Sequence, residues 1–161
     1  MEGGGTCHAI RLEAIMQYRS IGQVKVSAIG LGAMPMSIEG RPDKGQSILG
    51  PKLVAVQNQY SPKHRRTADT LVHCGDLGLT FLPWSPLGGI TSAKALGDKN
   101  APFQQVADAH GVSPQQVALA WELAQGQHVI PIPGASRPET ILDSIKAIDL
   151  ELTPDELELL S

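Results

Sequence analysis

Cysteines, aromatic rings and long apolar runs are all scarce in this sequence. The 161 residues include two cysteines, Cys7 and Cys74, which stand far apart and form no C-x-x-C pair. Isolated cysteines indicate free thiols in a reducing, cytoplasmic compartment. No apolar run approaches the roughly 18 residues that a membrane-spanning helix needs, so we expect no membrane partner. The opening stretch "MEGGGTCHAIRLEAI" has no continuous apolar segment with a cleavage site, which argues against a secretory signal.

An excess of positive charge is also missing. The formal net charge is -3, so no broad basic surface indicates a nucleic-acid partner. Cys7 beside His8 offers too few ligands to predict a metal site. The hydrophobic content of 42% is that of an ordinary globular domain. Residues 1–15 match nothing that follows and are interpreted as a disordered or adventitious extension of one domain, 16–161.

The first part of the domain predicts a hairpin. Apolar residues alternate on both sides of Gly22 in "MQYRSIG" and "QVKVS", and a third, fully apolar strand, "AIGLG", covers 28–32. Residues 34–52 are rich in Gly and Pro and predict a loop.

The second part alternates apolar strands with helices. This order is typical of a parallel α/β sheet or barrel with right-handed crossovers. Within the first helix, Ser61 is the expected cap, and Leu71, Val72 and Cys74 are expected to face the core. The predicted strands are 53–57, 79–85 and 128–134, and the predicted helices are 61–78, 102–111, 113–126, 137–148 and 152–160.

Two later helices carry start signals. Ser113 and Thr153 are each followed by a proline, and then by Gln116 and Glu156 at the capping-box position.

Several motifs together resemble the aldo-keto reductases. "YRSIGQVKVSAIGLGAMPMS" resembles the hairpin and first strand of that family, and "VQNQYSPKHRR", "FLPWSPLGGI" and "VALAWELAQGQHVIPIPGASRPETILDSIKAID" resemble its last three β/α units. The resemblance implies a (β/α)8 TIM barrel that binds NADP(H) across the carboxyl ends of its strands and reduces small carbonyl substrates to alcohols.

The same comparison implies that the middle of the barrel is missing. Gly32 and Leu53 are separated by twenty residues, whereas one parallel crossover alone takes about a dozen residues and a whole barrel about 250. The expected fold is therefore an incomplete barrel, with strand one and strands six to eight present and strands two to five missing.

The catalytic Asp, Tyr, Lys and His of the family would lie in that missing part. No D-x-A-x-x-Y-G stretch occurs, and neither Tyr18 nor Tyr60 matches the catalytic position. His64, His73 and His110 fall on predicted helices, where a solvated or packed ring is expected. Without a positioned acid, roughly 10²- to 10⁴-fold in rate is lost, so we expect no catalytic residue and no meaningful reductase activity from the isolated chain.

The cofactor side of the family pattern is better preserved. By resemblance, Gln57 bonds the nicotinamide carboxamide, Trp84 stacks on the nicotinamide ring, and Ser85, Leu87 and Gly88 form a loop near the pyrophosphate. Gly permits a close backbone approach there, and an indole offers a large π-face.

The loop before the helix 137–148 resembles the family's clamp on the adenosine 2′-phosphate. Unpaired N–H groups at a helix start favour phosphate, and an arginine can bind it through two nitrogens. A second basic residue is absent, so preference for NADP over NAD rests on Arg137. The matching residues are Gly134, Ala135, Ser136, Arg137, Thr140 and Asp143, with Ala33 and Met34 near the nicotinamide.

Three interpretations stay open at this point. The chain is a non-catalytic remnant that still binds NADP(H), an enzyme rebuilt by self-association through open sheet edges, or a degenerate product that folds poorly. Three or four barrel strands are too few to close into a ring. An open parallel edge favours pairing with another strand or leaves the fold marginally stable.

Overall fold

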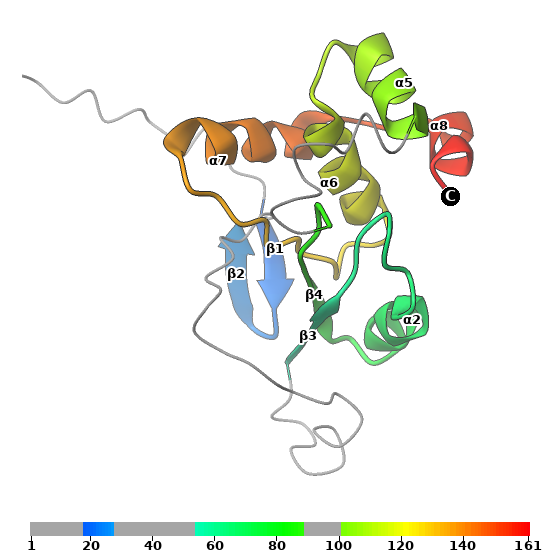
Figure 1. Cartoon of the computed structure of the whole chain (residues 1–161). Helices are drawn as coiled ribbons and strands as arrows, with labels where there is room; N and C mark the ends of the chain where they lie inside the picture. The colour runs from blue at the N-terminus through cyan, green and yellow to red at the C-terminus, as the bar shows by residue number, and fades with distance from the viewer. Residues whose placement is uncertain (1–17, 28–53, 89–100) are drawn as a thin grey trace, which may run out of the picture.

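The computed structural model describes residues 18–27, 54–88 and 101–161. Figure 1 shows these parts as a small sheet with an antiparallel hairpin on one side, one helix on the other side and the remaining helices gathered at one end. The strands are β1 (Tyr18–Ile21), β2 (Val24–Ser27), β3 (Ala55–Gln59) and β4 (Thr80–Trp84). The helices are α2 (Ala68–Asp76), α5 (Ala101–His110), α6 (Pro114–Ala124), α7 (Pro138–Ile145), the 3-10 helix η3 (Lys146–Asp149) and α8 (Pro154–Leu159).

The predicted hairpin is confirmed. β1 and β2 pair antiparallel, with Ile21 opposite Val24, and Gly22 makes the turn with a φ of +56°. Only glycine adopts this backbone conformation without strain. The predicted strand at 28–32 and the loop at 34–52 lie outside the described residues.

β3 and β4 form the parallel core of the sheet. Their register places Gln57 opposite Leu82 and Gln59 opposite Trp84. The segment 128–134 was predicted as a full strand, but among the described residues it joins β4 only through the bridges Phe81–Val129 and Trp84–Ile132. The Ile130 and Ile132 N–H groups donate to the Phe81 and Pro83 carbonyls, but Pro83 of β4 has no N–H to return to the Ile130 carbonyl, which explains the interrupted ladder.

The helix predicted for 61–78 begins later than expected. Residues 61–64 form a turn in which the Ser61 Oγ accepts from the His64 N–H at 3.2 Å, so Ser61 does not cap the helix. α2 starts at Ala68, and the Thr67 hydroxyl before it donates to the Gln59 carbonyl at 2.5 Å. Pro62, directly after Ser61, favours a turn here.

The core-facing residues of α2 were predicted in part correctly. Leu71 and Cys74 are buried, but Val72 is 60% exposed, so the assignment of Val72 to the core was wrong. Residues 71 and 74 lie on one helical face, and position 72 is turned 100° from 71.

Of the two capping boxes predicted at the starts of later helices, one is confirmed in full and the other in part. Thr153 and Glu156 form the predicted capping box. Ser113 caps α6 by accepting from the Gln116 N–H at 3.2 Å, but the Gln116 side chain bonds Asp143 instead of returning to the cap. The predicted helix 137–148 is divided into α7 and η3.

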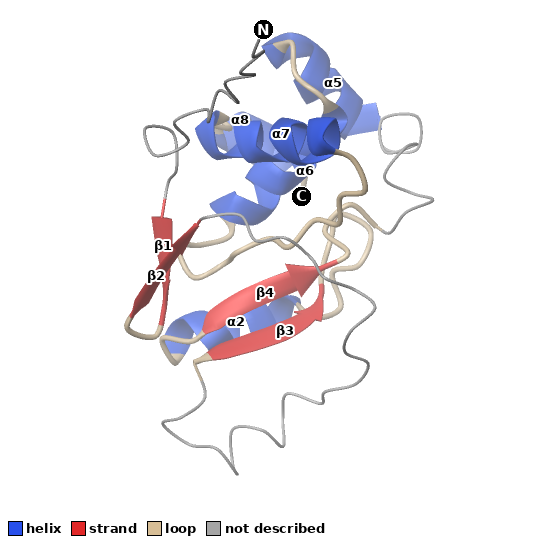
Figure 2. Cartoon of the chain, turned by 90° about the vertical axis from the view of Figure 1, so that its left-hand side faces the viewer, coloured by secondary structure: helices blue, strands red, loops and turns tan. Residues whose placement is uncertain are grey.

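The buried core lies between the sheet and the helices. Figure 2 shows α2 along one face of β3 and β4, with α6 and α7 beyond the end of the sheet. Val56 and Phe81 point from the sheet into this core, where they join Val117, Leu119 and Trp121 of α6. The result is an α/β sheet with the strand order of a partial barrel, and the described strands do not close into a ring.

Candidate functional site

Three parallel segments end at the same edge of the sheet. Gln59 ends β3 opposite Trp84, which ends β4, and Trp84 in turn bridges to Ile132. The loops that begin at Ser85 and Pro133 therefore leave the sheet side by side. Ligands of parallel α/β sheets bind at the carboxyl ends of the strands, so this edge is the candidate site.

One face of the sheet carries polar and aromatic residues toward this edge. Side chains alternate along a strand, so Gln57 and Leu82, which are register partners, lie on the same face as Trp84. Gln57 is exposed and Trp84 is half-buried. The opposite face carries the buried Val56 and Phe81. The face with Gln57 and Trp84 is thus open for contact.

The turn after β4 is held in an uncommon backbone conformation. Ser85 has a φ of +52°, the one such non-glycine residue in the part of the chain that the structure describes. The Gly88 N–H closes the turn on the Ser85 carbonyl at 2.8 Å. Leu87 is 7% exposed and packs in the core. The buried leucine therefore fixes the turn while Ser85 and Gly88 stay partly accessible.

The loop 134–137 is accessible and opens a helix. Gly134, Ser136 and Arg137 are exposed, and no heavy atom lies within 4 Å of the place where a Cβ on Gly134 would stand. Arg137 precedes α7 in extended conformation, and its side chain makes no cap hydrogen bond. Pro138 has no N–H and the Thr140 N–H donates to the Arg137 carbonyl, so Glu139 offers the first-turn N–H that an anion could use. A helix start without a cap leaves donors available for an anion.

Asp143 takes part in a different set of contacts. Its Oδ2 accepts from the Ser113 hydroxyl at 2.7 Å and its Oδ1 from the Gln116 amide at 2.5 Å. The carboxylate thus ties α7 to the start of α6. Thr140 is half-buried on the preceding turn of α7, and its backbone N–H donates to the Arg137 carbonyl at 3.1 Å.

The tyrosines do not supply an acid at this edge. Tyr60 is 3% exposed and stacks on Trp121, with ring centroids 5.6 Å apart. Burial raises the pKa of Tyr60, and the charge of Glu122 adds to this while Arg65 opposes it. A catalytic phenol needs its pKa lowered instead. Tyr18 is 55% exposed on β1.

The histidines are not gathered into a site. His73 and His110 lie on helices as predicted and are exposed, whereas His64 lies in the turn before α2, not on a helix. The His110 Nε2 bonds the Glu156 carboxylate at 2.7 Å. Across the described residues, no group of three or more His, Cys, Asp or Glu side chains could hold a metal ion.

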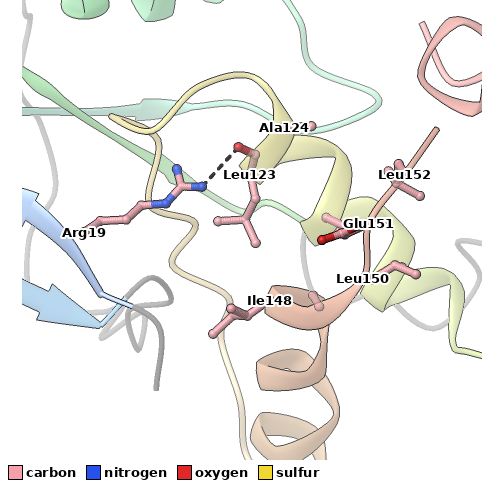
Figure 3. Close-up of a pocket in the computed structure, with 9 residues that line it drawn as sticks. Arg19, Leu123, Ala124, Ile148, Leu150, Glu151 and Leu152 are labelled. Atoms are coloured by element: carbon pink, nitrogen blue, oxygen red, sulfur yellow. Dashed lines mark hydrogen bonds between the residues drawn. The ribbon is translucent and has the colours of Figure 1, made fainter. Parts of the chain in front are cut away.

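A pocket of about 340 Å³ lies between α6, η3 and the segment 150–152, and Arg19 of β1 is among its lining residues. Figure 3 shows Arg19 of β1 reaching toward the Leu123 carbonyl beside this pocket. The guanidinium also donates to the carbonyl groups of Gly126 and Val129, and the Thr80 hydroxyl donates to the Ser20 carbonyl at 2.9 Å. Arg19 therefore fastens the hairpin across the amino ends of the strands, away from the candidate site.

Sequence reasoning passed over two residues. Arg19 gave no signal, because an arginine in a short strand is ordinarily exposed. Glu122 is fully buried on α6, and its signal was available in "VALAWELA", where one carboxylate interrupts an otherwise apolar run.

A parallel α/β sheet with accessible loops at its carboxyl edge is the architecture of the α/β barrel class of folds, whose sites lie at that edge. Within that class, the Aldo/keto reductase family model matches residues 25–161. The chain belongs to the aldo/keto reductase family. The characteristic activity of this family is the NAD(P)H-dependent reduction of carbonyl compounds.

Curated relatives are longer than this chain. Pyridoxine 4-dehydrogenase of Escherichia coli is 33% identical over 112 residues, which are 68% of this chain and 36% of the relative. Probable aldo-keto reductase 1 of Glycine max is 30% identical over 131 residues, with 65% of this chain and 38% of the relative covered. The chain thus spans about a third of the length of these relatives.

Solved structures agree in fold. The thermostable aldo-keto reductase Tm1743, in complex with the inhibitor epalrestat, superposes with a TM-score of 0.63 at 27% identity, over 73% of this chain and 42% of that one. The Bombyx mori aldo-keto reductase in complex with NADP gives a TM-score of 0.57 at 24% identity, over 66% and 36%. The latter likeness concerns the fold alone.

In the described parts of our chain, no helix is both long and apolar enough to cross a bilayer.

Proposed function

We propose that this chain is a non-catalytic aldo/keto reductase remnant that binds NADP(H) at the carboxyl edge of β3, β4 and the segment 129–132. The observation that carries the proposal is the pairing of Trp84 with Ile132, because it brings the loops 85–88 and 134–137 to one edge. Gln57 and Trp84 would contact the nicotinamide, and Ser85, Leu87 and Gly88 the pyrophosphate.

The adenosine end of the cofactor would lie at the start of α7. Gly134, Ala135 and Ser136 would admit the 2′-phosphate to the Glu139 N–H in the first turn, and Arg137 would bind it through its guanidinium. Thr140 and Asp143 follow on the same helix. Glu139, exposed in the first turn, opposes an anion there, so we expect weak binding.

No carbonyl reduction is assigned to the isolated chain. Tyr60 is buried with a raised pKa, and the family's catalytic stretch is absent from the sequence. A small carbonyl compound would become a substrate only where a partner supplies the missing acid. The cytoplasmic location stays a prediction, consistent with Cys74 as a free, buried thiol.

The test compares NADPH and NADH binding to the purified chain by quenching of Trp84 fluorescence. Arg137→Ala should weaken NADPH binding by about tenfold to a hundredfold, since a charge-assisted contact contributes about 1.5–3 kcal/mol. NADH, which lacks the 2′-phosphate, should bind the variant and the unchanged chain equally. Arg66→Ala removes an exposed arginine of the turn before α2 and serves as the matched control.

Each outcome has a meaning for the proposal. A loss confined to NADPH and to Arg137→Ala supports the assigned phosphate loop. Equal losses for both cofactors would place Arg137 elsewhere. Absence of saturable quenching from a folded sample would overturn cofactor binding and leave a remnant without this function.

A second candidate function is an enzyme rebuilt by assembly. The observation that favours it is the open edge of β3, which among the described strands has β4 as its one neighbour. A second copy could pair there and enclose the exposed face that carries Gln57.

A further inference from the structure

The Glu122 side chain is a buried carboxyl without a partner. It is 0% exposed, and neither of its oxygens has a hydrogen-bond partner among the residues that the structure describes. The preceding residues of α6, Val117 to Trp121, are buried as well. A carboxylate in such surroundings loses its hydration and gains nothing in return, whereas a protonated carboxyl loses far less.

Helix α6 connects several elements of the fold. At its start, Gln116 bonds Asp143 of α7, and at its end, the Leu123 carbonyl accepts from Arg19 of β1 at 3.2 Å. In its middle, Trp121 stacks on Tyr60. A change in the packing of α6 would therefore reach the hairpin, the sheet and α7 together.

We propose that Glu122 makes the packing of α6 depend on a proton. While the carboxyl is protonated, α6 packs fully against β1, α7 and Tyr60, and loss of this proton loosens the helix. The inference rests on the place of Glu122 in the fold and does not depend on cofactor binding.

The electrostatic surroundings agree with this assignment. Burial raises the pKa of Glu122 well above its ordinary value, and among the described residues no ion pair involves this carboxyl. The Tyr60 phenol responds to the charge of Glu122, and the Arg65 guanidinium lies 4.6 Å from the centroid of the Trp121 ring. The other charged or titratable groups on the elements around α6 are Tyr18 and Arg19 on β1, Asp108 and His110 on α5, Glu139 and Asp143 on α7, and Lys146 and Asp149 on η3.

The direction of the pH effect follows from the raised pKa. Below the unfolded-state pKa of a glutamate, about 4.3, both states hold the proton and the packing is at full strength. Above it, the unfolded chain releases the proton while the folded chain keeps it. The unfolding equilibrium constant therefore rises about tenfold per pH unit, until the pH passes the folded-state pKa.

The experiment measures urea unfolding of the whole chain between pH 4 and 8 for the unchanged protein, Glu122→Gln and Glu158→Gln. Glu158 is exposed on α8 and serves as the control. The unchanged protein and the control should share the one-proton loss of stability, and Glu122→Gln should lack it. Parallel curves for all three proteins would overturn the proposal.

A second measurement covers the case in which Glu122→Gln does not fold. The infrared spectrum of the unchanged protein should show the carbonyl band of a protonated carboxylic acid at a pH just above the range in which exposed carboxyl groups ionise. As the pH is raised, this band should disappear, and over the same pH range the backbone amides of α6 should exchange their hydrogens faster. Absence of the band from folded protein at every pH where the exposed carboxyl groups are ionised would show that Glu122 is ionised as well, and the proposal would be wrong.

Discussion

At the scale of single residues, Glu156 combines a structural role with a titration. Its Oε2 accepts from the Thr153 backbone N–H at 2.8 Å and its Oε1 from the His110 ring at 2.7 Å. The backbone hydrogen bond, followed by the bond from His110, lowers the pKa of Glu156. This carboxylate thus joins the start of α8 to the end of α5.

We expect Glu156 to stabilise the fold on the alkaline side of its titration. Because its folded-state pKa is depressed, its contribution is present above the unfolded-state value, about 4.3, and is lost as the pH falls through the folded-state pKa. Glu156→Gln should therefore be less stable than the unchanged protein at neutral pH, with the difference shrinking in acid. Urea unfolding at a series of pH values gives this difference, and Glu122 cancels because both proteins contain it.

Asp155→Asn is the matched control for Glu156→Gln. Asp155 is exposed in the same helical turn, so it tests charge at the helix start without the two bonds. A pH-independent difference between Glu156→Gln and the unchanged protein would contradict the assignment.

Residue types predicted local structure well where the cause was local. The capping box at Thr153 and the turn at Gly22 depend on neighbours in the chain, and both are confirmed. Gln116 and Val72 were wrongly assigned because distant residues decide their positions. Gln116 finds a carboxylate on α7, and no described element covers Val72 on the outer face of α2.

At the scale of elements, the contact between α6 and α7 decides how the proposed phosphate loop is held. Gln116 is 5% exposed, and its amide donates to Asp143. Asp143→Ala leaves this buried amide without an acceptor, so the free energy of unfolding should fall by about 1–3 kcal/mol. Thermal or urea unfolding measures the loss.

NADPH affinity then distinguishes two roles for Asp143. If the carboxylate acts by holding α7 in place, Gln116→Ala should weaken NADPH binding in the same direction as Asp143→Ala, and this is the result we expect. If Asp143 contacts the cofactor itself, only its own substitution should reduce affinity. Fluorescence titration of both variants, at a temperature where each is folded, provides the comparison.

The prediction of elements succeeded where periodicity was long and failed where proline intervened. α5 and α6 begin and end within two residues of the predicted bounds. Pro83 of β4 lacks the N–H that would face the segment 128–134, and Pro62 favours a turn at 61–64 where a helix start was predicted. The candidate site depends on the shared strand edge, which the chain order predicted and the register of β3 and β4 bears out.

At the scale of the whole molecule, the part of the sheet that the structure describes ends at β3. The Val54 carbonyl accepts from the Thr80 N–H, and the Tyr60 N–H donates to the Trp84 carbonyl. Hydrogen bonds alternate along a parallel strand, so the N–H groups of Ala55 and Gln57 point to the side away from β4. The Gln59 N–H, which faces the same side, is bound by the Asn58 Oδ1 at 3.0 Å.

This open edge predicts self-association through β3. Sedimentation velocity over a range of concentrations should show a discrete, reversible dimer, because a strand with free donors pairs readily with a second copy. Ala55→Pro removes one outward N–H without removing a β3–β4 hydrogen bond, and should shift the equilibrium toward monomer. Val72→Lys, which places a charge on the exposed surface of α2, should leave the monomer–dimer equilibrium unchanged.

A dimer that responds to Val72→Lys and not to Ala55→Pro would place the contact on the helix. A folded chain that stays monomeric at every concentration would exclude pairing, and with it an active site rebuilt from two copies.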